Sequence, residues 1–183
     1  QVCRMEPKDF RQRRPDGSGG WVWSMNGVQR VLYRLPEIVA AMESRRYVLL
    51  TEGEKDADAL AAVGFAATPN PGGAGKWQAN YTETLTGGNV VIIPDKDEPG
   101  RRHGRMVAGE LLPVAASVRL LELPDRDGRR VKDAADWISA GGTADELKAL
   151  VKACPLLTPA DVEPEPEPER KPAQPKVKGV PEY

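Results

Sequence analysis

The sequence predicts an α/β domain built on a mostly parallel sheet that is flanked by helices. Between residues 47 and 154, short apolar runs of strand length alternate with stretches of helical periodicity. The two strongest runs, Tyr47–Thr51 and Val90–Ile93, are apolar at consecutive positions, which is typical of strands buried on both faces of a parallel sheet. A basic lead segment (1–46) and a proline-rich tail (155–183) flank this region, so the sequence divides into three parts.

The lead segment is expected to contain a little β structure. Phe10–Trp23 includes the glycine-rich turn Asp16–Gly20 and is predicted to form a hairpin. Trp21 and Trp23 share one face of its second strand, and they are expected to form the core of this segment. A further strand and a short helix that Pro36 opens are predicted at Val31–Tyr33 and Glu37–Met42.

The central region supplies the remaining elements in order. After the strand Tyr47–Thr51, Ala/Leu spacing predicts a helix that ends at Gly64. Pro99 is suited to the first turn of a later helix. Thr143 and Glu146 form a capping box that opens the last helix. The predicted elements beyond the first strand are the helix Glu54–Val63, the strand Phe65–Thr68, the strand Val90–Ile93, the helix from Pro99 to Leu112, the strand Ser117–Leu123 and the helix Ala144–Ala153.

The tail is predicted to be a disordered linker. Eight of the 17 prolines fall in residues 155–183, where Pro and Glu alternate and Tyr183 is the single aromatic residue. Such a stretch cannot bury enough apolar area to offset the entropy of ordering. A linker implies a further domain, and the absence of an initiating Met likewise suggests a piece of a longer chain.

Composition argues against a membrane or secreted protein. Charged residues make up 29% of the 183 residues, and no apolar run approaches the roughly 20 residues that a bilayer span requires. The N-terminus has no apolar segment of the kind found in a secretory signal. Cys3 and Cys154 lie at opposite ends, which predicts neither a disulfide framework nor an internal zinc site and favours a reducing cytoplasm. The net charge of −1 gives no global basic field, but the lead segment holds nine basic and five acidic residues and could face a polyanion.

Acidic residues follow two of the predicted strands. Glu52 comes directly after the first, and Asp95 and Asp97 follow Val90–Ile93. Chemistry in open α/β sheets collects at the carboxyl ends of the strands, so the three carboxylates are expected to converge there. A set of hard oxygen ligands suits Mg²⁺, which uses one or two carboxylates together with substrate phosphates. A D-x-D after a strand can also be a turn or a helix cap, and this alternative stays open.

These motifs resemble the TOPRIM domain, which is shared by bacterial-type primases, topoisomerases and certain nucleases. The segments Glu52-Gly53-Glu54-Lys55-Asp56 and Asp95-Lys96-Asp97-Glu98-Pro99-Gly100 are similar to its two acidic motifs. Lys132-Asp133 resembles the start of a K-D-P-D segment in primases, although the second acidic member falls on Ala135, with Asp136 one position on. The similarity runs from Tyr47 to Ala153 and is greatest to phage and plasmid primases or primase-helicases.

The resemblance implies a role for each matched residue. Glu52 would be a general acid/base or a metal-proximal carboxylate, and Asp95 and Asp97 would bind Mg²⁺ or Mn²⁺. Asp56 and Asp133 would be secondary members of the acidic ring. The residues expected to contact nucleotide or nucleic acid are Lys55, Lys76, Lys96, Arg101 and Arg102.

Several other features have two interpretations each. Pro71–Lys76 fails the P-loop spacing, and it is either a phosphate-cradling loop or an ordinary glycine turn. The arginines after Asp97 either reach phosphates or lie on a solvated helix face. His103, the single histidine, is expected to make a local hydrogen bond rather than to act in catalysis. Trp77 and Trp137 are expected to pack in the fold rather than to stack on bases.

The leading hypothesis is a metal-dependent nucleotidyltransferase domain of a phage or mobile-element DNA primase. It would use NTPs to make RNA primers on single-stranded DNA, in the cytoplasm of a bacterial or phage-infected cell. The parent protein would carry, or associate with, zinc-binding and helicase domains, and no membrane partner is expected. The alternatives are a TOPRIM nuclease that cleaves DNA with the same carboxylates and a non-catalytic nucleic-acid-binding module.

Overall fold

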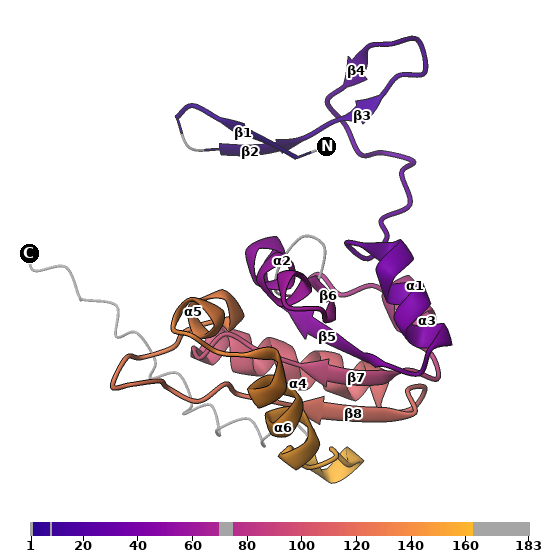
Figure 1. Ribbon diagram of the computed structural model, residues 1–183. Coiled ribbons are helices and arrows are strands. Elements are labelled where there is room, and N and C mark those ends of the chain that lie inside the picture. The colour runs from indigo at the N-terminus through magenta and orange to yellow at the C-terminus, as the bar shows by residue number, and fades with distance from the viewer. Residues whose placement is uncertain (1, 8, 70–74, 163–183) are drawn as a thin grey trace, which may run out of the picture.

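Four parallel strands form the central sheet, in the order β6-β5-β7-β8 (Figure 1). The structure is a computed structural model, and it describes residues 2–7, 9–69 and 75–162. The strands of this sheet are β5 (Tyr47–Thr51), β6 (Ala66–Pro69), β7 (Asn89–Ile92) and β8 (Ser117–Leu120). The helices are α1 (Leu35–Glu43), α2 (Glu54–Ala62), α3 (Ala79–Thr84), α4 (Glu98–Leu111), α5 (Ala134–Ser139) and α6 (Ala144–Ala153). The predicted class, an α/β fold with a parallel sheet flanked by helices, is confirmed.

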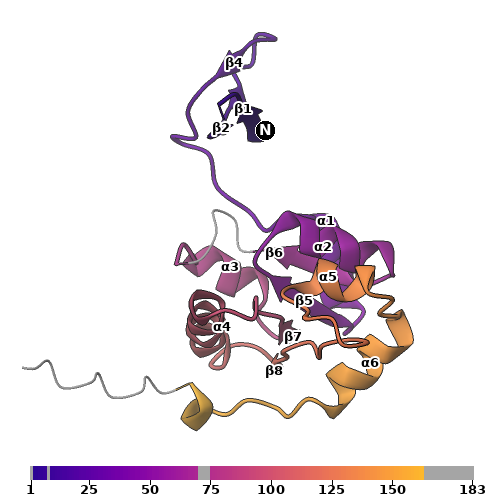
Figure 2. The same cartoon turned by 90° about the vertical axis from the view of Figure 1, so that its left-hand side faces the viewer.

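Successive side chains along the central strands point to opposite faces of the sheet, which divides the core into two layers. Val48 and Leu50 of β5 pack on one face with side chains from α1, α3 and α4, while Leu49 packs on the other face with α2, α5 and α6. All three side chains are at most 3% exposed. A strand covered on both sides needs apolar residues at every position, which explains the unbroken apolar run in the sequence. Figure 2 shows α3 and α4 on one side of the sheet and α5 and α6 on the other.

Most predicted element ends agree with the structure to within a few residues. Helix α2 ends just before Gly64, whose φ of 93° requires a residue without a Cβ. The capping box of α6 is present in full, with the Thr143 side chain on the backbone of Glu146 and the Glu146 side chain on the backbone of Thr143. Local chemistry alone specifies such ends, so the sequence is sufficient to find them.

Three elements differ from expectation. Residues 31–33 form no strand, and Leu32 instead packs against the core with only 2% of its surface exposed. Helices α3 and α5 were not predicted. Each has six residues, too few for a helical repeat to stand out in the sequence.

The lead segment forms two small hairpins instead of one. Strand β1 (Val2–Met5) pairs with β2 (Asp9–Gln12), and β3 (Arg14–Pro15) pairs with β4 (Trp21–Val22). The glycine-rich turn of the second hairpin is held by Asp16, whose Oδ1 accepts hydrogen bonds from the backbone N–H groups of Ser18 and Gly20.

The prediction that Trp21 and Trp23 form a core is wrong. Trp21 is 45% exposed and Trp23 is 53% exposed. Both figures show the hairpins apart from the α/β body, which therefore does not cover the indoles (Figures 1 and 2). By contrast, Trp137 is fully buried, and Trp77 packs edge-on against Tyr81 with its Nε1–H donated to Thr82, as expected for packing residues.

Residues 155–162, which the sequence assigns to the tail, contact the body. The backbone N–H of Leu157 donates to the carbonyl of Val118 at 2.9 Å, and the side chains of Leu157 and Val162 pack on the core. A short 3₁₀ helix, η1, spans Pro159–Asp161. The Pro/Glu-rich stretch from residue 163 onward lies outside the described residues. In the part of the chain that the structure describes, no helix is long and apolar enough to span a membrane.

Candidate active site

The three strand-end carboxylates lie at the same edge of the sheet, where Glu52 contacts the backbone of Asp95. Glu52 leaves β5 and Asp95 leaves the neighbouring strand β7, and Glu52 Oε1 accepts a hydrogen bond from the backbone N–H of Asp95 at 3.1 Å. Gly100 makes this approach possible, since a Cβ there would clash with Glu52 Oε1 and with the Asp95 carbonyl. The sequence predicted from strand order that Glu52 and Asp95 lie close together, and the glycine supplies the space for their approach.

Asp97 also caps helix α4. Its Oδ1 accepts the backbone N–H of Gly100 at 2.9 Å. The cap alternative that the sequence left open is therefore realised at this residue. Capping occupies Oδ1, whereas Oδ2 faces a lysine.

Lys132 places its ammonium group between the two aspartates. Its Nζ lies 3.1 Å from Asp95 Oδ2 and 3.8 Å from Asp97 Oδ2. The backbone N–H of Lys96 donates to the Lys132 carbonyl at 2.9 Å, which anchors this loop to the β7 edge. Lys132 was not among the predicted site residues. The Lys132-Asp133 pair in the resembling segment was the available signal, but that pair alone does not say which carboxylate the lysine meets.

A second acidic group lies beside the first. Asp56, only 6% exposed, accepts the backbone N–H of Ala135 through Oδ1 at 3.0 Å. Asp133 caps α5 through the N–H of Asp136 at 2.7 Å. Lys55 Nζ lies 3.6 Å from Asp133 and 3.7 Å from Asp136. Each acidic group thus contains one lysine.

The carboxylates influence one another electrostatically. Burial raises the pKa of Glu52, and the charges of Asp95 and Asp97 raise it further, while Lys132 lowers it. Burial raises the pKa of Asp56 to about 6, with added contributions from the charges of Asp133 and Asp95. Hydrogen bonding to Asp95 raises the pKa of Lys132, so this lysine stays protonated. The negative charges at this edge of the sheet therefore attract cations and make it easier for Glu52 and Asp56 to hold a proton.

The five predicted phosphate-contacting residues have different surroundings. Lys96 bonds to Asp125 and to the Leu123 carbonyl, and Arg101 forms a two-point pair with Glu122 at 2.6 and 3.2 Å. Lys55 lies between acidic partners, as described above. Lys76 is exposed, while residues 70–74 of its loop lie outside the described residues. Arg102 lines an open groove together with Gly75, Pro99, His103 and Met106.

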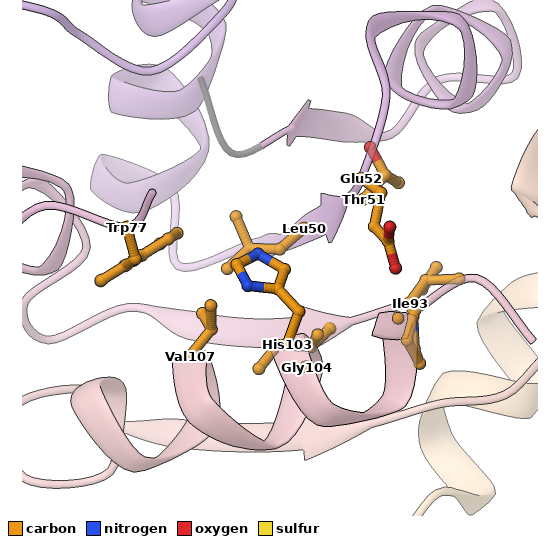
Figure 3. A pocket seen from close by; sticks show the side chains of 11 residues that line it. Leu50, Thr51, Glu52, Trp77, Ile93, His103, Gly104 and Val107 are labelled. Carbon is orange, nitrogen blue, oxygen red and sulfur yellow. The ribbon is translucent and has the colours of Figure 1, made fainter. Parts of the chain in front are cut away.

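A small and mostly apolar pocket adjoins Glu52. It is lined by side chains from β5, β7 and α4 and by Trp77, and Figure 3 shows His103 between Trp77 and Glu52. His103 Nδ1 accepts the backbone N–H of Gly75 at 3.2 Å, so the histidine makes a hydrogen bond as expected, although its partner is 28 positions away in the sequence and not local. Burial lowers the pKa of His103, so the imidazole is neutral and can act as this acceptor.

The donor set fits a hard divalent cation. Among the described residues, no group of three or more His, Cys, Asp or Glu side chains is already gathered tightly enough to hold a metal. However, a cationic ammonium group lies between Asp95 and Asp97, where carboxylate oxygens of opposite charge attract it. A cation with water ligands could take that place, because Mg²⁺ needs only one or two protein carboxylates beside its waters and substrate phosphates.

Comparison with known proteins places the chain in a phage family. No family profile matches it. It is 34% identical to the gene 57 protein of Mycobacterium phage D29 over 117 residues. The aligned region covers 63% of this chain and 72% of the phage protein. The chain belongs to the gene 57 protein family. This gene 57 family member therefore has a phage relative, as the motifs implied.

Solved primase structures share the fold of this gene 57 family member. The Aquifex aeolicus primase with its zinc-binding and RNA polymerase domains matches with a TM-score of 0.62 and 22% identity, over 81% of this chain and 36% of that one. The catalytic core of the E. coli primase matches with a TM-score of 0.59 and 20% identity, over 85% and 51%. A DnaG primase catalytic domain bound to single-stranded DNA matches with a TM-score of 0.57 and 22% identity, over 77% and 45%. The chain thus spans about half or less of these primase chains and has a primase-type fold.

Proposed function

We propose that this chain is the TOPRIM-type nucleotidyltransferase domain of a phage DNA primase, which extends RNA primers on single-stranded DNA from NTPs. The observation that carries the proposal is the placement of Glu52, Asp95 and Asp97 at the carboxyl edge of two neighbouring parallel strands, with the Lys132 ammonium group between the two aspartates. The primase-type fold and the phage relative support it.

Asp95 and Asp97 would hold Mg²⁺ or Mn²⁺, and Glu52 would lie next to it. The chemistry that such a cation would supply is positive charge to stabilise the negative charge that develops on the phosphate during transfer. Lys132 has a 58% exposed side chain, so it can move into solvent and stay near the edge as a positive charge for phosphates. Asp56 and Asp133 would add negative charge behind the ligands.

Glu52 is the residue best placed to hold or move a proton. It is directed at the strand edge by the Asp95 N–H, and the raised pKa makes its carboxyl a better proton acceptor than an ordinary glutamate. Asp97 is fixed in direction because its other oxygen caps α4. The chain therefore offers two oriented aspartates for a metal and one glutamate for the proton.

The parent protein would associate this domain with others. The matching Aquifex primase includes a zinc-binding domain, and we propose a comparable zinc-binding module, and a helicase domain, in the parent of this chain. Its proposed place of action is the cytoplasm of a phage-infected bacterium, with the template and NTPs as partners.

The test combines metal binding with activity. Mn²⁺ titration by calorimetry should show binding that Asp95→Asn greatly weakens, while Asp145→Asn is the matched control because Asp145 is a 91% exposed carboxylate on α6 that pairs with Lys148. Primer synthesis on a single-stranded template is then compared with plasmid nicking. Nicking without primer synthesis would favour the nuclease alternative, and the lack of any divalent-metal binding would favour a non-catalytic binding module.

A further inference from the structure

The β3–β4 hairpin exposes an aromatic and cationic surface far from the carboxylate edge. This surface consists of Arg13, Trp21 and Trp23, and we call it the tryptophan platform. The Arg13 guanidinium carbon lies 4.1 Å from the centre of the Trp21 ring and 5.4 Å from that of the Trp23 ring. One guanidinium group over two indoles places both rings on the same side of the hairpin.

The exposure of these rings calls for a partner. Trp21 and Trp23 are 45% and 53% exposed, although burying a tryptophan removes roughly 150–250 Å² from water. Two large aromatic side chains together on a surface are typical of interaction sites rather than of free surface. Both figures show the hairpin apart from the α/β body (Figures 1 and 2).

Charge identifies the partner as an anion with flat apolar faces. Residues 9–30 contain four arginines and two aspartates, and no lysine or glutamate. Four guanidinium groups outnumber two carboxylates, which leaves a positive excess in this segment. Guanidinium groups suit phosphates because their N–H donors form a planar fork, and a stacked arginine keeps that fork at its rim. Indole faces suit nucleobases, which stack on aromatic rings whatever their sequence.

We propose that the tryptophan platform binds single-stranded nucleic acid, with bases stacked on Trp21 and Trp23 and phosphates near the arginines of the hairpin. A duplex would bind less well, because its bases are already stacked on one another. The inference deepens the proposed function, since it names a binding place for a single strand, but it needs neither metal nor the carboxylates.

The test measures binding of the full 183-residue chain, in EDTA, to a fluorescein-labelled oligothymidylate of about 15 nucleotides. This length suits small single-strand-binding surfaces. Trp21→Leu and Trp23→Leu should each weaken binding roughly tenfold or more, because one stacked base is lost. Trp21→Phe and Trp23→Phe should stay within a few-fold of wild type, because phenylalanine still stacks. Binding should also quench indole fluorescence and weaken as salt rises.

Tyr47→Leu is the matched control. The Arg119 guanidinium lies over the Tyr47 ring at 5.3 Å, so this is another aromatic–arginine pair with an exposed ring, located on the α/β body. Its loss should leave oligonucleotide binding unchanged. An oligoribonucleotide of the same length shows whether RNA is bound as well as DNA.

Several results would overturn the proposal. These are no binding by the wild type, leucine variants that bind as well as wild type, equal losses in the leucine and phenylalanine variants, or a duplex that binds as tightly as a single strand. Self-association that the leucine variants abolish, without oligonucleotide binding, would assign the platform to a second copy of the chain. Because the binding assay is run in EDTA, it measures the platform without any metal chemistry, so failure of the proposed metal site and failure of the platform give different results.

Discussion

Lys132 Nζ lies 3.1 Å from Asp95 Oδ2, at the place where a divalent cation would be expected. The ammonium group partly neutralises two aspartates and lowers the pKa of Glu52, which their charges raise. In the metal-free protein, Lys132 thus supplies the positive charge between Asp95 and Asp97. The structure leads us to expect competition between Lys132 and a metal for the same carboxylates.

Lys132→Met tests this competition. Removing the ammonium leaves three carboxylates with less compensation, so the metal-free protein should become slightly less stable. Mn²⁺ should bind more tightly, because no lysine must be displaced. Thermal melting in EDTA and calorimetric titration measure the two effects, with Lys148→Met as control for an exposed lysine pair. Weaker Mn²⁺ binding in Lys132→Met would show that the lysine does not compete.

Asp97 serves both as a helix cap and as a proposed ligand, and two substitutions separate these roles. Asn keeps a capping oxygen, so Asp97→Asn should fold with nearly wild-type stability and lose most metal affinity. Asp97→Ala should lose metal affinity and a further ~1 kcal/mol of stability, because the Gly100 N–H loses its partner. Equal metal binding in wild type and Asp97→Asn would mean that Asp97 is only a cap.

Glu52→Gln should reduce catalysis by a larger factor than metal affinity. Two aspartates with water and phosphate oxygens suffice for Mg²⁺, and Gln keeps an oxygen that can accept the Asp95 N–H. It cannot exchange a proton, however. Mn²⁺ titration is compared with primer synthesis in the parent protein. A parallel fall in both quantities would make Glu52 a ligand and not an acid/base.

Asp56 should make the metal-free protein less stable as the pH rises. Its folded-state pKa of about 6 lies above the ordinary value of 3.8, so the folded chain keeps this proton when the unfolded chain has lost it. Stability therefore falls between these two pKa values, by on the order of 2–3 kcal/mol in total. Asp56→Asn should then be more stable than wild type at pH 7.5 and show little advantage near pH 4, measured by thermal melting in EDTA. A variant that is less stable at both pH values would show that the charged form is needed for the Ala135 hydrogen bond.

Elements with a strong local pattern were predictable, and short or irregular ones were not. The apolar run Tyr47–Thr51 and the capping box at Thr143 predict a strand and a helix start from a few adjacent residues alone. Helices α3 and α5 do not, because six residues give no repeat. The tryptophans of the lead segment were misassigned because period-two spacing indicates a shared face but not whether another layer covers that face.

At the candidate site, the sequence by itself determined which acidic residues follow adjacent strands, and strand order in a parallel sheet then brought Glu52 near Asp95. Only the tertiary structure decided what fills the space between them. Lys132 is 35 or more positions from Asp97 and Asp95, and it reaches them because its loop is hydrogen-bonded to the backbone of Lys96. Such long-range partners follow from how loops pack after folding, since an ammonium group on a flexible side chain carries no local signal of the carboxylate it will meet. For the same physical reason, the fold alone revealed that Trp21 and Trp23 remain uncovered beside Arg13.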